Sequence, residues 1–389
     1  MAQDVVVVGG GPAGLAFARS LAGSGLAVTV VERQPLAALQ DPTCDGREIA
    51  LTHRSVTTLT ALGAWAHLDP EDIAPLREAR VLNGSSRFAL SFDTGATGED
   101  RLGQLVPNHR IRRALFLATR DQPGLDLIAG VDVGSVTSSA AGRVVTLADG
   151  RVLRPRLLVA ADSRFSAVRE QLGIAAEVNR LGRSMLVCRV AHDGDHGGSA
   201  TEWFEHGHTI AMLPLNGTLS SAVLTLPAEE AERIAALDPV ALGAEITRRY
   251  DARLGAMRVV EGPRLYPLAT TYARHFVATG AALIGDAAVG MHPVTAHGFN
   301  LGLQGQATLA ALVNKAAARG CDIATPLLLR RYEAAHRLAS RPIYAATNLL
   351  VGLYTDERPA ARLARHATLR AGARLPMVRD AVSRLLMQP

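Results

Sequence analysis

The chain has 389 residues, of which 48% are hydrophobic and 20% are charged, and its formal net charge is +5. These proportions are typical of a globular protein with room for two domains, and they exclude a disordered or low-complexity chain. No apolar stretch is long enough to cross a bilayer. Nucleic acid is disfavoured as a partner because the body of the chain is nearly neutral and has few aromatic residues.

The cysteines and the first residues of the chain indicate in which cellular compartment the protein is expected. Cys44, Cys188 and Cys321 are widely separated, leave an odd one over and match no spacing of metal ligands. Scattered thiols of this kind are typical of a reducing compartment. The N-terminus runs directly into a predicted strand, and we read no signal peptide there. The sequence therefore predicts a cytoplasmic protein with no bound metal.

The first predicted elements are a strand, a glycine-rich turn and a helix. Residues 5–8 are four valines, which predict a buried strand, and residues 15–21 carry apolar side chains at helical spacing. Between them Gly9 permits a tight turn, Gly11 lets the backbone approach a pyrophosphate, and Gly14 lets the helix pack closely on the strand. The free amides and the dipole at the start of such a helix favour phosphate groups.

An acidic residue completes this pattern. The next predicted strand, residues 27–31, ends in Glu32, whose carboxylate is placed to accept hydrogen bonds from a ribose diol. Strand, glycines, helix and acid thus occur in the order that a dinucleotide site requires. The alternative is a glycine-rich turn that binds no ligand, and this order disfavours it.

The middle of the chain changes from an α/β pattern to a run of strands. The first part predicts helices at 53–65 and 108–119, a strand at 105–106, a hairpin of 144–147 with 151–153, and a strand at 157–161 that leads to Asp162. The second part predicts strands at 185–190, 201–204, 209–213 and 220–226. Short strands separated by turns predict a mostly antiparallel sheet inserted into the α/β body.

The α/β pattern returns in a second glycine-containing segment. A predicted strand at 281–284 delivers Gly285 and Asp286 to its carboxyl end, where ligands bind in open α/β sheets. An apolar helix is expected from Gly298 to Val313, and its free amides would suit the electron-rich pyrimidine end of a flavin. A structural loop followed by a capped helix is the alternative. Combined with the first motif, this segment indicates FAD.

The basic excess lies in the C-terminal tail. From Asp356 onward the sequence contains seven arginines and three carboxylates, so that the net charge of this segment is +4. Leucine, methionine and valine side chains are interspersed among the arginines. This pattern predicts one or two amphipathic helices that could contact an anionic membrane surface. A helical cap that packs on the body is an equally open alternative. The inner face of the bacterial membrane is therefore a second expected location.

These motifs together resemble the group A flavoprotein monooxygenases, in particular the ubiquinone-biosynthesis hydroxylases of the UbiH, UbiF and VisC type. The similarity covers nearly the whole chain. The matching segments are Gly9, Gly11, Gly14 and Glu32; residues 45–51 and 55–65; residues 105–115; residues 211–215; Gly285-Asp286; His292-Pro293; and residues 298–302.

The resemblance implies an α/β fold like that of para-hydroxybenzoate hydroxylase, with a Rossmann-like FAD-binding domain and an inserted, mostly antiparallel β-sheet substrate domain. The implied FAD-binding domain is discontinuous and covers residues 1–80, 101–180 and 262–345. The implied substrate domain covers 81–100 and 181–261, and the basic amphipathic helices cover 346–389.

The resemblance also implies an activity. NAD(P)H would act as a transient reductant of FAD, and oxygen would then be transferred from a flavin C4a-hydroperoxide to an electron-rich phenol or quinol ring. The implied substrate is a polyprenylated phenol or benzoquinol such as demethoxyubiquinol. Contact with a membrane or with a ubiquinone-biosynthesis complex is the implied partner relation, and the oligomeric state stays open.

The resemblance carries over residue by residue to a set of predicted site residues. The predicted catalytic residues are Pro293, His297 and Gly298, where the imidazole of His297 could donate a hydrogen bond or carry a proton. A loop histidine with no catalytic role is the alternative. The predicted cofactor-binding residues are Gly9, Gly11, Pro12, Ala13, Gly14, Glu32, Arg33, Arg47, Asn108, Asp162, Gly285, Asp286, Pro293, Gly298, Phe299 and Asn300.

Two departures from the family pattern bear on the site. Asp162-Ser163-Arg164 stands where the family usually has Asp-Gly, which weakens the expectation for NAD(P)H. His297 lies in Thr295-Ala296-His297-Gly298, where relatives usually have Ala-Gly-Gln-Gly, and this segment resembles the UbiM branch of demethoxyubiquinol hydroxylases.

Three other polar residues and two other functions stay open. Glu202, His206 and His208 could be mistaken for a metal cluster, but strand alternation favours a solvated face or hairpin. The first alternative function is a hydroxylase of a small soluble aromatic acid, which predicts an arginine in the pocket and no membrane affinity. The second is a non-catalytic FAD-binding member of a biosynthetic complex.

Overall fold

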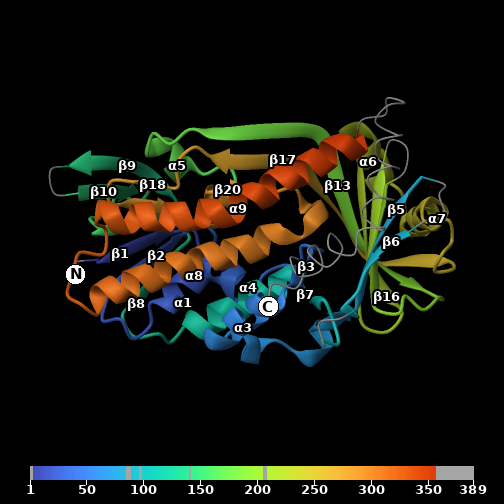
Figure 1. Cartoon of the computed structure of the whole chain (residues 1–389), viewed down its shortest axis with the longest axis horizontal. Coiled ribbons are helices and arrows are strands. Elements are labelled where there is room, and N and C mark those ends of the chain that lie inside the picture. The colour runs from blue at the N-terminus through green and yellow to red at the C-terminus, as the bar shows by residue number, and fades with distance from the viewer. Residues whose placement is uncertain (1–2, 85–88, 96–98, 140–141, 205–207, 356–389) are drawn as a thin grey trace.

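The computed structural model describes residues 3–84, 89–95, 99–139, 142–204 and 208–355. The molecule has two halves that lie side by side along its long axis (Figure 1). One half is built on a six-stranded sheet with helices packed against it, and the other is built on an eight-stranded sheet.

The six-stranded sheet has the order β18-β19-β12-β1-β2-β8. All neighbours are parallel except β18 and β19. The four valines of β1 are all buried, as expected for a parallel strand covered on both faces. The strand bounds are β1 (Val5–Val8), β2 (Val28–Glu32), β8 (Leu125–Ala129), β12 (Leu157–Ala160), β18 (Val277–Ala278) and β19 (Ala281–Leu283).

Helices and two small sheets complete this half. The helices α1 (Pro12–Ser20) and α8 (His297–Ala317) pack against each other, and α9 (Pro326–Thr355) packs along α8. One small sheet has the order β11-β10-β9 and the other β3-β7-β4. Their bounds are β3 (Glu48–Leu51), β4 (Ala74–Leu76), β7 (Gly103–Pro107), β9 (Val133–Ser139), β10 (Gly142–Leu147) and β11 (Val152–Leu153). The remaining helices here are α2 (Leu36–Gln40), α3 (His53–Ala61), α4 (Asn108–Thr119), α5 (Ala167–Gln171) and the short 3-10 helices η1 (Trp65–His67), η2 (Pro70–Asp72), η4 (Gly285–Ala287) and η5 (Pro293–Thr295).

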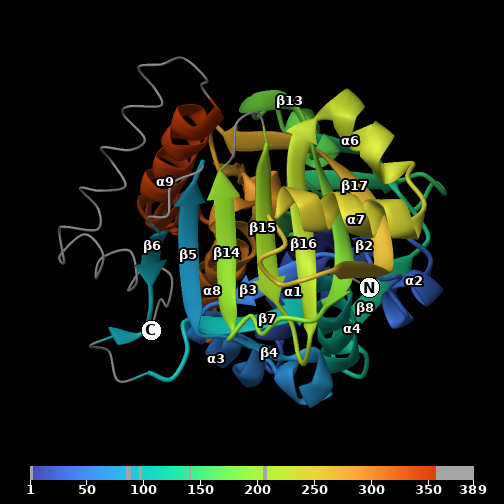
Figure 2. The ribbon, with the colours of Figure 1, turned by 90° about the vertical axis from the view of Figure 1, so that its right-hand side faces the viewer.

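The eight-stranded sheet has the order β20-β17-β13-β16-β15-β14-β5-β6 and is antiparallel except between β14 and β5. Two helices, α6 (Ala228–Ala235) and α7 (Pro239–Arg249), lie on its outer face (Figure 2). The strand bounds are β5 (Glu78–Asn83), β6 (Ala89–Phe92), β13 (Ala176–His192), β14 (Ser199–Phe204), β15 (Thr209–Pro214), β16 (Leu219–Pro227), β17 (Met257–Ala273) and β20 (Val289–Gly290).

Strand alternation divides the side chains of this sheet between two faces. Leu186, Cys188 and Val190 of β13 belong to the apolar core shared with α6 and α7. Met185 and Val187 point the other way, toward the six-stranded half. The expected α/β fold with an inserted, mostly antiparallel sheet is confirmed.

Two long strands join the halves. β13 and β17 pair antiparallel along most of their length, and they reach from the eight-stranded sheet into the other half (Figure 1). The predicted domain boundaries at 180/181 and 261/262 fall inside these strands. The division into domains by residue number stays a prediction.

One predicted helix is shorter than expected, and the tail lies outside the described residues. The helix predicted at 53–65 ends at Ala61, because Gly63 has φ +75°, which α-helical backbone cannot adopt, and η1 follows. The amphipathic tail predicted beyond residue 355 falls on undescribed residues. Within the described ranges, no helix combines the length and hydropathy needed to cross a bilayer.

Candidate functional site

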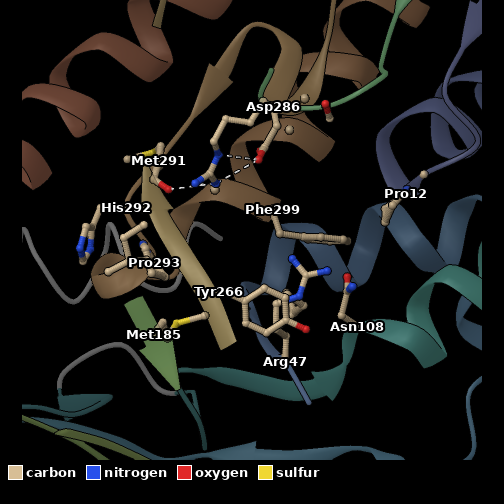
Figure 3. Close-up of a pocket in the computed structure, with 18 of the residues that line it drawn as sticks. Pro12, Arg47, Asn108, Met185, Tyr266, Asp286, Met291, His292, Pro293 and Phe299 are labelled. Atoms are coloured by element: carbon tan, nitrogen blue, oxygen red, sulfur yellow. Dashed lines mark hydrogen bonds and ion pairs between the residues drawn. The ribbon is translucent and has the colours of Figure 1, made fainter. Parts of the chain in front are cut away.

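A cavity of about 1050 Å³ connects the glycine-rich turn with the inner face of the eight-stranded sheet. Its volume lies just above the range of about 300–1,000 Å³ that is usual for small-molecule sites. Figure 3 shows Pro12 and Asn108 on one side of this cavity, His292 and Pro293 on the other, and Phe299 between them. The cavity therefore has room for a ligand that extends from the turn toward the sheet.

Most of the predicted site residues meet in this cavity. Three do not line it: Gly14, His297 and Asn300. Those that do are Gly9, Gly11, Pro12, Ala13, Glu32, Arg33, Arg47, Asn108, Asp162, Gly285, Asp286, Pro293, Gly298 and Phe299.

Each of the three glycines of the turn has a different structural reason to lack a side chain. Gly9 has φ +110°, and a Cβ there would collide with the carbonyl oxygen of Ala161. A Cβ on Gly14 would collide with the carbonyl oxygen of Gly9. Gly11 has ordinary extended backbone, and a Cβ there would meet no protein atom within 4 Å. The protein's own packing thus explains Gly9 and Gly14, whereas the bare backbone at Gly11 leaves space open to a ligand.

Glu32 holds the end of β2 against this turn. One carboxylate oxygen accepts a hydrogen bond from the Gly10 amide at 2.6 Å, and the other accepts one from the Gln34 amide at 2.8 Å. The carboxylate is only part-buried and lines the cavity. It retains lone pairs for a ribose diol, since each oxygen accepts two hydrogen bonds.

Arg47 lies in a polar cluster on the wall between the two halves. Its guanidinium pairs with Asp45 at 2.6 Å and lies 5.3 Å from the centre of the Tyr266 ring. Asn108 donates a hydrogen bond to the same carboxylate at 2.7 Å. Burial alone would raise the pKa of Asp45, but the Arg47 charge and the hydrogen bonds from Arg47 and Asn108 outweigh it and lower the pKa. Arg47 is thus fixed to Asp45 while its exposed side lines the cavity.

The departure at Ser163 has a structural counterpart. Ser163 has φ +139°, a conformation that glycine adopts freely and other residues do not. The next residue, Arg164, pairs with Asp286 at 3.1 Å and donates to the carbonyl oxygens of Ala269 and Met291. Dashed lines in Figure 3 mark the bonds that Asp286 and Met291 accept from the Arg164 guanidinium. Arg164 therefore links the turn after β12 to the second glycine-containing segment.

Asp162 uses its carboxylate within the protein. It accepts hydrogen bonds from the Ser166 hydroxyl at 2.6 Å and from the Val168 amide at 3.2 Å, at the start of α5. Burial raises the pKa of this carboxyl group despite these bonds. Asp162 lines the cavity, and its predicted role in cofactor binding stays a prediction.

The second segment brings a helix start to the cavity. Ala296 adopts a left-handed conformation with φ +53°, and α8 begins directly after it, so that Gly298 and Phe299 line the cavity. His292 caps η5 by accepting a hydrogen bond from the Val294 amide at 3.2 Å. Burial, together with the charges of two nearby arginines, lowers the pKa of His292 to about 4. Its ring is therefore neutral at physiological pH.

His297 and Asn300 are not among the residues that line the cavity. His297 is buried in the first turn of α8. Asn300 accepts hydrogen bonds from the Thr52 amide at 3.2 Å and the Ser55 hydroxyl at 2.7 Å, and it donates to the carbonyl oxygen of Ala50 at 2.8 Å. Asn300 thus positions α8 against β3 and α3. The predicted roles of both residues at the flavin stay predictions.

Sequence reasoning missed the polar residues on the inner face of the large sheet. Glu202 was expected on a solvated face or hairpin, but it lines the cavity, and burial raises its pKa to about 8. Arg183 and Tyr266 line the cavity as well. Alternation marked the face on which each residue lies, but no sequence signal marked that face as a cavity wall.

The lining fits a nucleotide cofactor and gives no sign of a metal site. The open space at Gly11, the start of α1 and the acceptor Glu32 could hold a pyrophosphate and a ribose. Among the described residues, no group of three or more histidine, cysteine or acidic side chains is arranged to hold a metal ion. His206 lies outside the described residues.

Comparison with known proteins agrees with this arrangement. The family model described as FAD binding domain matches residues 2–345. The chain is 44% identical to the ubiquinone hydroxylase UbiM of Neisseria meningitidis serogroup C, over 99% of this chain and 84% of that protein. It is 35% identical to the ubiquinone hydroxylase UbiL of Rhodospirillum rubrum, over 96% of this chain and 86% of that protein.

A solved structure shares the fold. The chain superposes on PqsL, a probable FAD-dependent monooxygenase from Pseudomonas aeruginosa, with a TM-score of 0.77 at 22% identity. The match covers 95% of this chain and all of that one. At this identity the likeness concerns the arrangement of the two sheets alone.

Proposed function

Because the chain belongs to the FAD-binding-domain family and is a FAD-dependent monooxygenase, we propose that it hydroxylates the ring of a polyprenylated phenol or benzoquinol, such as demethoxyubiquinol, on the route to ubiquinone. The expected relation to ubiquinone-biosynthesis hydroxylases is confirmed, and the UbiM branch is supported by 44% identity. The expected FAD is supported by the family match over residues 2–345.

The observation that carries the proposal is the continuity of the cavity. One end meets the glycine-rich turn, and the other ends on an apolar wall formed by alternate residues of the large sheet. An electron-rich ring with an alkenyl tail is an apolar ligand with few polar groups, and this wall offers the matching surface. The wall residues are Met185, Val187, Ala211, Leu213, Val223 and Leu268.

FAD would be held by residues of the six-stranded half. The amides at the start of α1 and the open backbone at Gly11 would bind the pyrophosphate, and Glu32 would accept hydrogen bonds from the adenosine ribose. Asp286, held by Arg164, would meet the ribitol or the phosphates. Gly298 and Phe299 at the start of α8 would meet the flavin ring.

The bound flavin supplies the reduction of O2 and the transfer of one oxygen atom to the ring. The chain's own part is to exclude water, to position the ring and to hold neutral groups near the reacting atoms. His292 fits the last task, because its lowered pKa keeps the imidazole uncharged. The apolar wall fits the first two.

NAD(P)H is the proposed reductant. The chain has no second glycine-rich dinucleotide motif, so the nicotinamide would dock transiently at the same cavity. Peripheral contact with a membrane or with other ubiquinone-biosynthesis proteins is also proposed. It rests on the basic C-terminal tail, which lies outside the described residues.

A small soluble aromatic acid is the second candidate substrate. The observation that favours it is Arg183 of β13, which lines the cavity near its apolar wall and could pair with a carboxylate. A polyprenylated ring carries no such carboxylate.

The test is a hydroxylation assay on purified, FAD-loaded protein with NADPH or NADH. The substrates are a short-chain demethoxyubiquinol and para-hydroxybenzoate, and mass spectrometry detects a product with one added oxygen atom. We expect the prenylated quinol to be hydroxylated. Hydroxylation of the aromatic acid alone would transfer the assignment to the second candidate. Deleting the gene should make a demethoxy prenylquinone accumulate, and restoring the gene should reverse this.

A further inference from the structure

Glu202 lies in the middle of the cavity wall formed by the large sheet. Its neighbours on β14, Thr201 and Trp203, point to the other face, where Trp203 packs in the core under α6 and α7. The pairing register places Glu202 beside Ala211 of β15, and Ala211 beside Val223 of β16. All three of these paired residues line the cavity. Glu202 therefore faces the space into which the ring of a substrate would fit.

The residues paired with Glu202 across the sheet are apolar, and the nearest polar side chain on the same face of β15 is the uncharged Thr209. Along the same face of β14 the next residue is Phe204, and the neighbouring strand β5 places Val81 opposite Glu202. Among the described residues of β13 to β17 that line the cavity, Glu202 is the one carboxylate. A carboxyl group between apolar neighbours is unfavourable unless a partner or solvent satisfies it.

The described part of the chain offers no such partner. No hydrogen bond and no ion pair joins the Glu202 carboxyl group to any described residue, and its raised pKa of about 8 has burial as its cause. The protein thus keeps a half-buried carboxyl group at the cavity wall without using it for its own structure. Groups of this kind are concentrated at functional sites.

Other titratable groups reach the cavity from several elements, but within the described ranges none is paired with Glu202 across the sheet. The adjacent strands contribute Ala211 and Val81, which do not titrate. None of the other titratable groups contributes a charge effect to the pKa of Glu202. The main groups on the facing elements are Arg183 of β13, Tyr266 of β17, Arg47 and Glu48 near β3, His292 before η5, and Asp286 of η4.

We propose that Glu202 binds the ring hydroxyl of the substrate and receives its proton, an assignment that rests on the proposed function. The O–H bond of the ring hydroxyl breaks, and its electron pair stays on the ring oxygen. The proton forms a new O–H bond to a Glu202 carboxylate oxygen. When the hydroxylated product leaves, the same proton returns to the ring oxygen, so that the carboxylate is regenerated.

The energetics favour Glu202 over an ordinary glutamate for this step. A phenol has a pKa of about 10 and an exposed glutamate one of about 4.3, so that proton transfer between them is strongly uphill. Burial brings the pKa of Glu202 to about 8, which removes most of this gap. A phenolate is more electron-rich than the phenol, and its ring is the better acceptor for an electrophilic oxygen.

The test compares Glu202→Gln with the wild-type holoenzyme. Glutamine keeps the size and the hydrogen-bonding capacity of the side chain but cannot take the proton. We expect kcat for hydroxylation to fall about 100-fold or more, as for the loss of a general base, with a smaller change in KM. The wild-type rate should rise with pH through the pKa of Glu202 and then level off, and the variant should lose this rise. Glu229→Gln, the same change on the exposed side of α6, is the matched control and should leave both rate and pH profile unchanged.

A second readout does not depend on turnover. Ultraviolet absorbance of a bound halogenated phenol, chosen with a pKa close to that of Glu202 so that a shared proton divides about equally between them, should report phenolate in the wild-type protein at pH values above the Glu202 pKa. Glu202→Gln should bind a larger fraction of neutral phenol at the same pH. If Glu202→Gln loses FAD, Glu202→Asp takes its place, and it should keep the pH-dependent rise at a lower rate. A wild-type protein that forms phenolate but hydroxylates no prenylated quinol would contradict the proposed substrate alone. An unchanged rate and pH profile in Glu202→Gln, or neutral phenol bound to the wild type at every pH, would overturn the role of Glu202.

Discussion

Alanine at Gly11 and alanine at Gly14 should have opposite consequences, although the two glycines belong to one turn. Gly11 has φ −76° and ψ −179°, which alanine adopts readily, and its added Cβ would meet no protein atom within 4 Å. The folded protein without cofactor should therefore tolerate Gly11→Ala. Its unfolding free energy should stay equal or rise by about 0.4–1 kcal/mol, because alanine restricts the unfolded chain.

FAD binding should respond in the other direction. The Cβ of Gly11→Ala would occupy the space through which the backbone approaches the pyrophosphate. The loss of one hydrogen bond to a charged phosphate costs about 1.5–3 kcal/mol, which weakens binding by a factor of about 10 to 150. Gly14→Ala instead places a Cβ against the Gly9 carbonyl oxygen, and such overpacking costs about 1–3 kcal/mol of folding stability.

The assay uses protein stripped of FAD. Chemical unfolding gives the stability of each variant, and quenching of FAD fluorescence on titration gives the dissociation constant. The reasoning would be refuted if Gly11→Ala bound FAD as tightly as the wild type, or if it unfolded more easily than Gly14→Ala. The first result would mean that the open space at Gly11 does not receive the pyrophosphate, and the second would mean that this space is not open in the folded protein.

Three further substitutions test other parts of the site. Ser163→Gly should stabilise the protein by about 1 kcal/mol in chemical unfolding, because it relieves φ +139° at a smaller entropic cost; a loss of stability would show that the serine is not strained. Asn300→Ala should lower the unfolding free energy by about 3 kcal/mol, since Thr52, Ser55 and Ala50 lose hydrogen-bond partners, and unchanged stability would argue against this network. The folded-state pKa of His292 is lowered to about 4, so its contribution to stability is present above about pH 6.5 and is lost as pH falls toward 4. Between pH 6.5 and 4 the unfolding free energy of His292→Gln should therefore fall by less than that of the wild type, with a difference of up to about 3 kcal/mol. If both proteins lost the same unfolding free energy over this interval, the His292 ring would not be buried in its neutral form.

Local sequence patterns were sufficient to predict the main elements of the half that contains the six-stranded sheet. The valines of β1, the order of Gly9, Gly11 and Gly14, and the acid at the end of β2 each depend on neighbours within a few residues or on one adjacent strand. The helix predicted at 108–119 has the observed bounds of α4 for the same reason. The helix predicted at 53–65 is four residues too long, because apolar spacing continues through residue 65 although the backbone conformation of Gly63 ends the helix at Ala61.

The substrate wall needed tertiary information. The alternation of side chains along a strand assigns Glu202 and Trp203 to opposite faces of β14, but it does not say which face borders a cavity and which is packed in a core. The outer face is covered by α6 and α7, which lie later in the chain, and the inner face is covered by the other half of the molecule. The same limit applies to Arg47, whose contact with the Tyr266 ring joins segments far apart in the sequence.

Side-chain contacts around the sheet wall, two of which join it to the other half, bear on where substrate specificity should reside. Arg189 of β13 pairs with the buried Glu48 of β3 at 2.7 Å and with Glu261 of β17 at 3.4 Å. The Tyr266 hydroxyl donates to the carbonyl oxygen of Asp45 at 2.5 Å. These contacts, with the two long strands β13 and β17, hold the sheet wall at a set distance from the glycine-rich turn. A ring bound between two such surfaces cannot adjust by moving the wall, so its position depends on the side chains that the wall presents. Changes of substrate among relatives should therefore be found in the cavity-facing rows of β13 to β17, around Glu202, rather than in the turn around Gly11.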